Sequence, residues 1–163
     1  MADAPALRVG VGYDVHPFAP EGSDRVLVLG GVPFPGERAL AGHSDADAIA
    51  HAIGDAVLGA AGLGDIGQLF PDTDATLAGA DSLELLRMLA ARVRAAGWEP
   101  QNADCTAILD APRLAPHREE MEARLTAALG APVSVKATRP EGLGALGRGE
   151  GVACHAVALV ARR

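Results

Sequence analysis

The sequence predicts an α+β fold in which helices pack on one face of a mixed sheet of four or five strands. Its 163 residues are 49% hydrophobic and 21% charged, values typical of one globular domain with a core of ordinary size. Segments of strand and helix character follow in the order strands, helix, helix, strand, helix, strand, strand, which favours helices on one side of a sheet. We therefore expect a single domain over residues 1–163. In a chain of this size, oligomerisation usually covers the other face of the sheet.

The first strand is expected at residues 8–16. Side chains alternate between the two faces of a strand, so Val9, Val11 and Val15 share one face. The opposite face carries two glycines and two polar residues: Gly10, Gly12, Asp14 and His16. Because glycine has no side chain, something other than side chains is expected to fill the space beside them.

The first helix is expected from Asp45 to about Ala61, with Ser44 as its N-cap and Asp47 as the acid of a capping box. Helical periodicity places four apolar residues on the core face: Ile49, Ile53, Val57 and Ala60. Polar residues four apart line the opposite face: Asp47, His51 and Asp55. For Asp45 we expect a solvated acid favoured by the helix dipole. For Asp47, capping and a role near a metal both remain open.

Asp14, His16 and His51 together predict a metal centre. A carboxylate and an imidazole point the same way from one strand, and a second imidazole lies on the next helix. Three protein ligands with one free position are the pattern of catalytic zinc, whereas structural zinc is usually closed by four ligands.

The later elements follow from turn residues and periodicity. In chain order they are short strands at 26–29 and 32–34, a helix from 81 to about 96, a strand within 98–109, a helix from 116 to about 129, and strands at 133–137 and 152–160. A glycine-rich segment at 62–74 ends the first helix, and a second one at 138–151 is expected to lack regular structure.

Composition argues against several classes of partner. The formal net charge of −7 disfavours binding to nucleic acids or anionic membranes, which require basic patches. The N-terminal residues show neither a charged region nor an apolar region of a secretory signal, and no apolar run reaches the length of a membrane span. Cys105 and Cys154 lack C-x-x-C spacing and are expected to be buried, reduced thiols, so a cytoplasmic location is predicted.

Six sequence segments stand in a characteristic order. They are GYDVH at 12–16, GHSDAD at 42–47, HAIGDAVLGAAGLGDIGQLFPDTD at 51–74, APRLAPH at 111–117, VKAT at 135–138 and GRGEGVA at 147–153. The set spans nearly the whole chain and resembles the 2-C-methyl-D-erythritol 2,4-cyclodiphosphate synthase family. D-x-H alone would be a weak signal, but the ordered set is specific.

The resemblance implies roles for individual residues. Zinc would be bound by Asp14, His16 and His51, and a second divalent ion, magnesium or manganese, by Glu141. His43, Thr138 and Arg139 would be catalytic. The residues implied in substrate binding are Asp14, Val15, His16, His43, Ser44, Asp47, Asp55, Asp65, Ile66, Gly67, Phe70, Pro71, Asp72, Thr73, Asp74, Leu109, Asp110, Ala111, Pro112, Arg113, Leu114, Ala115, Thr138, Arg139, Pro140, Glu141, Ala145 and Arg148.

Within that set, the resemblance assigns the ribose to Asp55, the cytosine to residues 109–115 and the methylerythritol hydroxyls to residues 65–67 and 70–74. Taken alone, several of these residues have plainer explanations. Four residues of the glycine-rich segment at 62–74 are of types common in turns: Asp65, Gly67, Asp72 and Asp74. Arg113 alone would be a solvated charge, and the glycines around Arg148 a flexible loop.

The resemblance also implies a reaction. A phosphorus–oxygen lyase would convert 4-diphosphocytidyl-2-C-methyl-D-erythritol 2-phosphate to the 2,4-cyclodiphosphate and release CMP, in non-mevalonate isoprenoid biosynthesis. Family members are homotrimers about a three-fold axis, with active sites between subunits and an axial cavity suited to an isoprenoid diphosphate. Two other classes remain open: a zinc-dependent phosphoester hydrolase, and a non-catalytic trimer that binds isoprenoid phosphates.

The chain departs from the family pattern at four positions. The usual K-A-T-T-T-E segment is K-A-T-R-P-E here, so Arg139 and Pro140 stand where threonines are expected. Arginine offers more donors and a positive charge to phosphate, which leaves the detailed role of this position open. Ala145 replaces an aromatic residue, and Arg113 replaces the more usual lysine.

Overall fold

The computed structural model describes residues 6–71, 73 and 78–163. The strands are β1 (Leu7–Pro17), β2 (Leu27–Leu29), β3 (Val32–Phe34), β4 (Trp98–Ile108), β5 (Val133–Thr138) and β6 (Gly151–Arg162). The helices are α1 (Ala48–Ala61), α2 (Ile66–Leu69), α3 (Ser82–Ala95), the 3₁₀ turn η2 (Ala115–His117), α4 (Arg118–Leu129) and α5 (Gly144–Gly147). None of the helices in this described part is long and apolar enough to cross a membrane.

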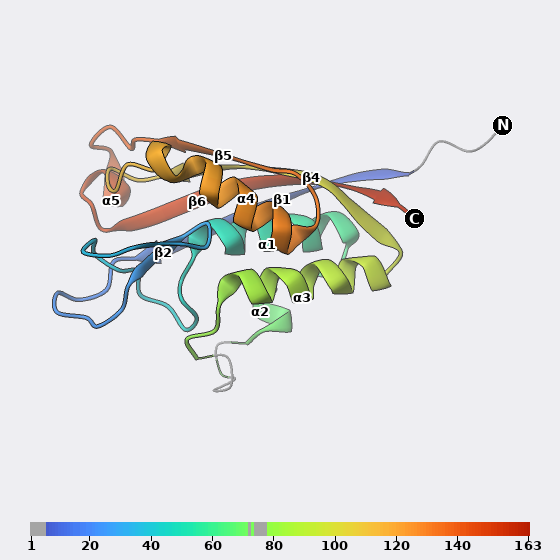
Figure 1. The fold of residues 1–163 in the computed structure, drawn as a ribbon, viewed down its shortest axis with the longest axis horizontal. Coiled ribbons are helices and arrows are strands. Elements are labelled where there is room, and N and C mark those ends of the chain that lie inside the picture. Colours follow the sequence, from blue (N-terminus) through green and yellow to red (C-terminus); the bar gives the residue numbers. More distant parts are fainter. Residues whose placement is uncertain (1–5, 72, 74–77) are drawn as a thin grey trace.

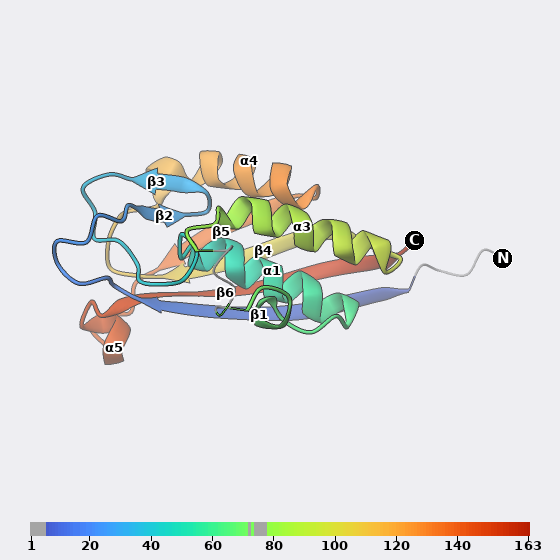
Figure 2. The same cartoon turned by 90° about the horizontal axis from the view of Figure 1, so that it is seen from below.

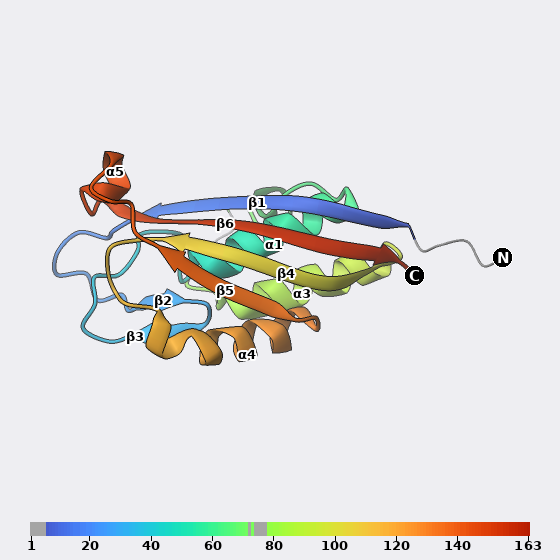
Figure 3. The same cartoon turned by 90° about the horizontal axis from the view of Figure 1, so that it is seen from above.

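Four of the described strands form one mixed sheet in the order β1-β6-β4-β5 (Figure 3). β6 is antiparallel to both β1 and β4, whereas β4 and β5 are parallel. β2 and β3 form a separate antiparallel hairpin. The predicted α+β class is therefore confirmed, with four strands in the main sheet.

Helices α1, α3 and α4 all lie on one face of the sheet (Figures 1 and 2), as the order of elements predicted. The core between the layers is aliphatic, and its largest fully buried side chains include Ile49, Ile53 and Leu89. Cys105 and Cys154 are buried on β4 and β6 and form no disulfide, as expected. No described helix covers the opposite face of the sheet, and the valines of β1 are exposed there: Val9 is 64% exposed and Val11 69%.

Gly10 and Gly12 bring the backbone of α1 into contact with β1. A Cβ atom on Gly10 would lie 2.0 Å from the carbonyl oxygen of Ala56, and one on Gly12 would lie 1.8 Å from that of Ala52. The space beside the glycines is thus filled by helix backbone. This close packing sets the N-terminal half of α1 against the end of β1 that carries Asp14 and His16.

The start of α1 corrects the predicted cap. The helix begins at Ala48, and its N-cap is Asp47 rather than Ser44. The Asp47 carboxylate accepts hydrogen bonds from the amides of Ile49 and Ala50, and also from Gly30 at 2.9 Å and Gly31 at 2.6 Å. Asp47 therefore caps the helix and holds the β2–β3 turn against it, a double task that Ser44 does not perform.

Two short helices lie where no regular structure was predicted. α5 contradicts the expectation that residues 138–151 lack regular structure. Gly142 and Gly149, both in left-handed conformations, flank its single turn. α2 lies within the glycine-rich segment after α1, and Asp65 caps it. The helix expected from Pro116 begins instead as the 3₁₀ turn η2 and becomes α-helical at Arg118.

Candidate metal centre and active site

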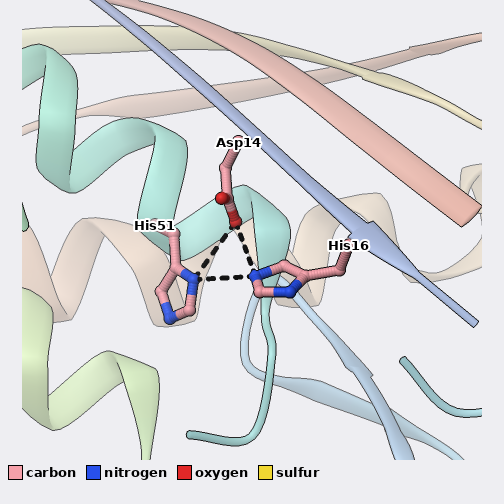
Figure 4. A group of neighbouring side chains, drawn as sticks. All are labelled: Asp14, His16 and His51. Carbon is pink, nitrogen blue, oxygen red and sulfur yellow. Dashed lines mark hydrogen bonds and ion pairs between the residues drawn. The ribbon is translucent and has the colours of Figure 1, made fainter. Parts of the chain in front are cut away.

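Asp14, His16 and His51 converge on one point between β1 and α1 (Figure 4). The Asp14 Oδ2 atom lies 2.9 Å from His16 Nε2 and 3.1 Å from His51 Nδ1, and the two nitrogens are 3.3 Å apart. All three side chains are partly buried, with exposed fractions between 12% and 23%. The sequence prediction that these residues meet is confirmed.

The ring of His16 has its other nitrogen engaged. His16 Nδ1 lies 2.9 Å from the carbonyl oxygen of Ala41. A carbonyl can only accept, so Nδ1 carries the proton of the neutral ring, and the lone pair of that ring is on Nε2, on the side of Asp14 and His51. This is the arrangement that metal-binding histidines usually show.

The geometry fits a metal cation. Two ligands bound tetrahedrally to zinc at about 2.0–2.1 Å lie about 3.3 Å apart, close to the separations found here. One carboxylate and two imidazoles are ligands that zinc accepts, and three of them leave a coordination position for a substrate atom. Asp14, His16 and His51 are therefore the residues of this chain that would hold the metal.

The charges of the centre support one another. Burial by itself raises the pKa of Asp14, but the hydrogen bonds and positive charge that His16 and His51 supply when their rings are protonated outweigh it and hold that pKa well below its usual range. Burial by itself lowers the pKa of His51, but the hydrogen bond and the negative charge of Asp14 raise it above the ordinary value. The Asp14 carboxylate is thus ionised and the centre favours positive charge.

A cavity of about 320 Å³ adjoins the centre. It is lined by His16, Gly42, His43, Ser44, His51, Ile66, Phe70 and Leu85. The structure therefore brings the predicted residues His43, Ser44, Ile66 and Phe70 next to the candidate metal centre. Gly42 and Leu85 were not predicted at the site.

Three aspartates predicted at the substrate have structural partners. Asp47 is fully buried, does not line the cavity and caps α1. The Asp55 carboxylate accepts a hydrogen bond from the amide of Ile66 at 2.7 Å. Asp65 caps α2 by accepting from Gln68 at 2.9 Å. Asp55 and Asp65 thus position the loop that carries Ile66, while Asp72 and Asp74 lie outside the described residues.

A second cavity of about 450 Å³ gathers the predicted cytosine loop. It is lined by Leu109, Asp110, Pro112, Arg113, Leu114, Ala115, Ala137, Thr138 and Arg139. These residues come from the connection between β4 and η2 and from the segment around the end of β5. Among the described residues, the two cavities share no lining residue, so Thr138 and Arg139 do not line the same cavity as His43 within one chain.

The remaining predicted residues lie between β5 and β6. Glu141 is exposed and has a left-handed backbone, with φ at 52°. Arg148 is exposed and donates to Glu150 at 2.6 Å, and Ala145 is part of α5. None of these three lines either of the two cavities.

Two residues at the centre were not predicted to serve it. Ser82, the first residue of α3, places its hydroxyl 2.9 Å from His51 Nε2, and Asp45 accepts from Ser82. Asp45 was expected to be a solvated acid, whereas the structure places it partly buried and bonded to α3. The contact spans 31 residues, and no local pattern in the sequence indicates it.

The chain matches known proteins over nearly its whole length. Residues 7–161 match the model of the YgbB family. The 2-C-methyl-D-erythritol 2,4-cyclodiphosphate synthase of Burkholderia ambifaria (strain MC40-6) is 56% identical over 159 residues, which cover 96% of this chain and 97% of that protein. The bifunctional enzyme IspD/IspF of Anaeromyxobacter dehalogenans (strain 2CP-C) is also 56% identical, over 99% of this chain. This chain spans only 42% of the length of that bifunctional relative.

A solved structure shows the same fold. IspF of Plasmodium falciparum, in a CDP complex, superposes with a TM-score of 0.82 at 30% identity, and the match covers 97% of each chain. Its likeness extends over the strands and helices that build both cavities. With a family match over residues 7–161 and a relative aligned along 97% of its own length, the chain belongs to the YgbB family, together with the 2-C-methyl-D-erythritol 2,4-cyclodiphosphate synthases.

Proposed function

We propose that this protein converts 4-diphosphocytidyl-2-C-methyl-D-erythritol 2-phosphate to 2-C-methyl-D-erythritol 2,4-cyclodiphosphate and CMP, a step of non-mevalonate isoprenoid biosynthesis. The observation that carries the proposal is the Asp14–His16–His51 centre beside a cavity, in a chain of the YgbB family. Because no water is consumed, the reaction is that of a phosphorus–oxygen lyase.

The bond changes are those of an internal phosphoryl transfer. An oxygen of the 2-phosphate attacks the β-phosphorus of the diphosphate and forms a new P–O–P bond. The bond from the β-phosphorus to the oxygen of the α-phosphate breaks, and CMP leaves with the electron pair. Since both partners are anionic, the reaction requires positive charge and alignment rather than a nucleophile from the protein.

The residues around the first cavity suit this task. A zinc ion bound by Asp14, His16 and His51 would act as a Lewis acid. A magnesium or manganese ion bound by Glu141, which does not line this cavity, would neutralise the diphosphate. His43 and Ser44 border the cavity next to the ligands and can donate hydrogen bonds to phosphate oxygens. Ile66, Phe70 and Leu85 provide apolar walls that exclude water from the reacting groups.

The second cavity suits the nucleotide. Its volume of about 450 Å³ is within the range of small-molecule sites. Thr138, Arg139 and Arg113 place a hydroxyl and two guanidinium groups on its walls, which are donors for phosphate and carbonyl oxygens. The Plasmodium falciparum relative is a CDP complex, which supports assigning the cytidine part of the substrate to this cavity.

A homotrimer would unite the two cavities. In one chain they share no residue, yet one substrate has to reach both the metal ligands and the nucleotide walls. The exposed valines of β1 form an apolar sheet face that association would bury. We therefore place each active site between neighbouring subunits, with Arg148 near an axial cavity that accepts an isoprenoid diphosphate, in a cytoplasmic enzyme.

A time course of phosphorus NMR on the purified protein tests the proposal. We expect CMP and a cyclic product without a phosphomonoester signal, and we expect both to vanish with a zinc chelator or in the His51→Ala variant. A zinc-dependent hydrolase would instead release a linear phosphate. Stoichiometric zinc without turnover would favour the non-catalytic binding trimer. Unchanged zinc content and CMP release in His51→Ala would overturn the proposal.

A further inference from the structure

The second ring nitrogen of His51 is held by α3. His51 Nε2 lies 2.9 Å from the hydroxyl of Ser82, which is only 1% exposed. α3 thus contributes two residues near the metal centre, since its Leu85 also lines the adjoining cavity. Ser82 itself does not line that cavity and touches the centre only through His51.

Asp45 determines which way the Ser82 hydroxyl points. The Ser82 hydroxyl donates to Asp45 Oδ1, and the Ser82 amide donates to Asp45 Oδ2 at 3.0 Å. With its hydrogen directed at the carboxylate, the Ser82 oxygen can only accept from the imidazole. The proton of the neutral His51 ring therefore belongs on Nε2, which leaves a lone pair on Nδ1.

We infer that Ser82 and Asp45 are positioning residues that hold His51 in the tautomer able to bind the metal. The inference rests on the proposed metal-dependent function and concerns residues that the family match does not assign. With the proton on Nε2, the Nδ1 lone pair faces Asp14 and His16, where the cation would lie. The opposite tautomer would let Nδ1–H donate to Asp14 Oδ2, but that hydrogen would occupy the position of the cation, and two lone pairs would face each other at Ser82.

Both histidines have a hydrogen-bond partner on the ring nitrogen that faces away from the candidate metal centre. His16 is oriented by the carbonyl of Ala41, and His51 by the Asp45–Ser82 pair, so each ring presents one lone pair to the same point. Ser44 is a second neighbour of His51 Nε2, at 3.1 Å; its hydroxyl oxygen accepts from the amide of Ala46 and keeps a second lone pair that can accept from His51. Loss of Ser82 would therefore weaken the orientation of His51 without abolishing it.

Zinc affinity of the purified, substrate-free protein tests this inference. Removing an outer partner of a metal-binding histidine typically costs about 10–100-fold in affinity. We expect Ser82→Ala and Asp45→Asn each to weaken zinc binding within that range, measured by competition with a chromophoric chelator. Because both changes break the same chain of hydrogen bonds, the double variant should be little weaker than either single variant.

Asp81→Ala is the matched control. Asp81 is the N-cap of α3 and accepts from the amide of Leu83 at 2.8 Å, so its loss loosens the same helix end without removing a bond to His51. We expect its zinc affinity to stay within about twofold of the original protein. Equal losses of zinc affinity in Asp81→Ala and Ser82→Ala would overturn the inference.

Nitrogen NMR of the metal-free protein at alkaline pH gives a second measurement. The ring signals of His51 should show the proton on Nε2 in the original protein and a mixture of tautomers in Ser82→Ala. A proton found on Nδ1 in the original protein would overturn the inference. Neither measurement uses substrate, so a protein that binds zinc as expected but releases no CMP would contradict only the proposed function.

Discussion

Gly12 and Ala52 are in backbone contact: a Cβ atom on Gly12 would lie 1.8 Å from the carbonyl oxygen of Ala52. Ala52 follows His51 directly in α1, and Gly12 lies two residues before Asp14 in β1. The distance between two of the metal ligands therefore depends on the absence of a methyl group. β1 and α1 also enclose one side of the hydrophobic core.

Gly12→Ala should separate β1 from α1. The added methyl group has no space, so we expect a loss of about 1–3 kcal/mol or more in the free energy of unfolding, together with loss of zinc binding. Gly59→Ala is the control in the same helix, because its Cβ atom would meet only the carbonyl oxygen of Val11 at 3.8 Å. Gly59→Ala should be neutral or stabilising by about 0.5–1 kcal/mol. Urea unfolding and zinc titration of both variants test this prediction. Equal losses of stability and zinc binding in Gly12→Ala and Gly59→Ala would contradict the close contact.

Removal of the metal should destabilise the fold. The ligands lie on two elements, so an ion that binds only the native state at a hundredfold excess over its dissociation constant stabilises it by about 2.7 kcal/mol. For a domain of this size, that corresponds to a fall of about 5–10 °C in the melting temperature when a chelator is added. In Asp14→Asn, which lacks the charged ligand, the chelator should change the melting temperature little. A chelator effect of equal size in both proteins would show that the ion acts elsewhere.

Asp47 should make stability depend on pH. Burial raises its pKa from 3.8 to about 6, with the negative charge of Asp45 acting in the same direction. Between these values the native state binds more protons than the unfolded state, so the free energy of unfolding falls as pH rises from about 4 to about 6 and then levels off. A shift of this size corresponds to about 3 kcal/mol.

Asp47→Asn isolates this effect. Urea unfolding of both proteins with a chelator present should show that the stability of the original protein relative to Asp47→Asn declines across this pH interval. A difference that stays constant, or grows with pH, would contradict the assignment. The variant should also be less stable throughout, since an amide cannot accept all four backbone hydrogen bonds that the carboxylate accepts.

Arg139 should contribute to nucleotide binding. It is an exposed residue on the wall of the second cavity, and a hydrogen bond to a charged group contributes about 1.5–3 kcal/mol. We expect Arg139→Ala to weaken CDP binding at least about tenfold by calorimetry, and Arg139→Lys to weaken it less. Arg118→Ala removes an equal charge from an exposed position outside this cavity and serves as control. Similar losses in both alanine variants would assign the effect to net charge alone.

The elements that the sequence predicted correctly are those in which apolar residues recur with a clear strand or helix periodicity. The alternation along β1 separates the buried Gly10 and Gly12 from the exposed valines, although the sequence did not indicate which face is buried. The apolar stripe of α1 is buried, as predicted. The metal ligands followed, because two residues spaced by two on a strand share a face and His51 lies on the polar side of the helix. Here the local rules and the tertiary structure agree.

The features that pattern missed depend on contacts between distant segments. Three polar residues near the start of α1 could each cap it, and only the hairpin turn, at Gly30 and Gly31, selects Asp47. Likewise, nothing local relates Ser82 to His51, because their contact exists only once α3 has packed on α1. The short helix α5 was missed because the many glycines of residues 138–151 were taken to exclude a helix there.

The strand order has a consequence for synthesis on the ribosome. Among the described strands, β1 pairs in the sheet with β6, the last strand along the chain. Asp14 and His16 therefore emerge from the ribosome long before the segment that completes their edge. Until β6 arrives, β1 is a nascent strand with unpaired amides and exposed valines, and it depends on α1 or on a chaperone for cover. The edge of the sheet that carries Asp14 and His16 should therefore be completed only after the segment that forms β6 has been synthesised.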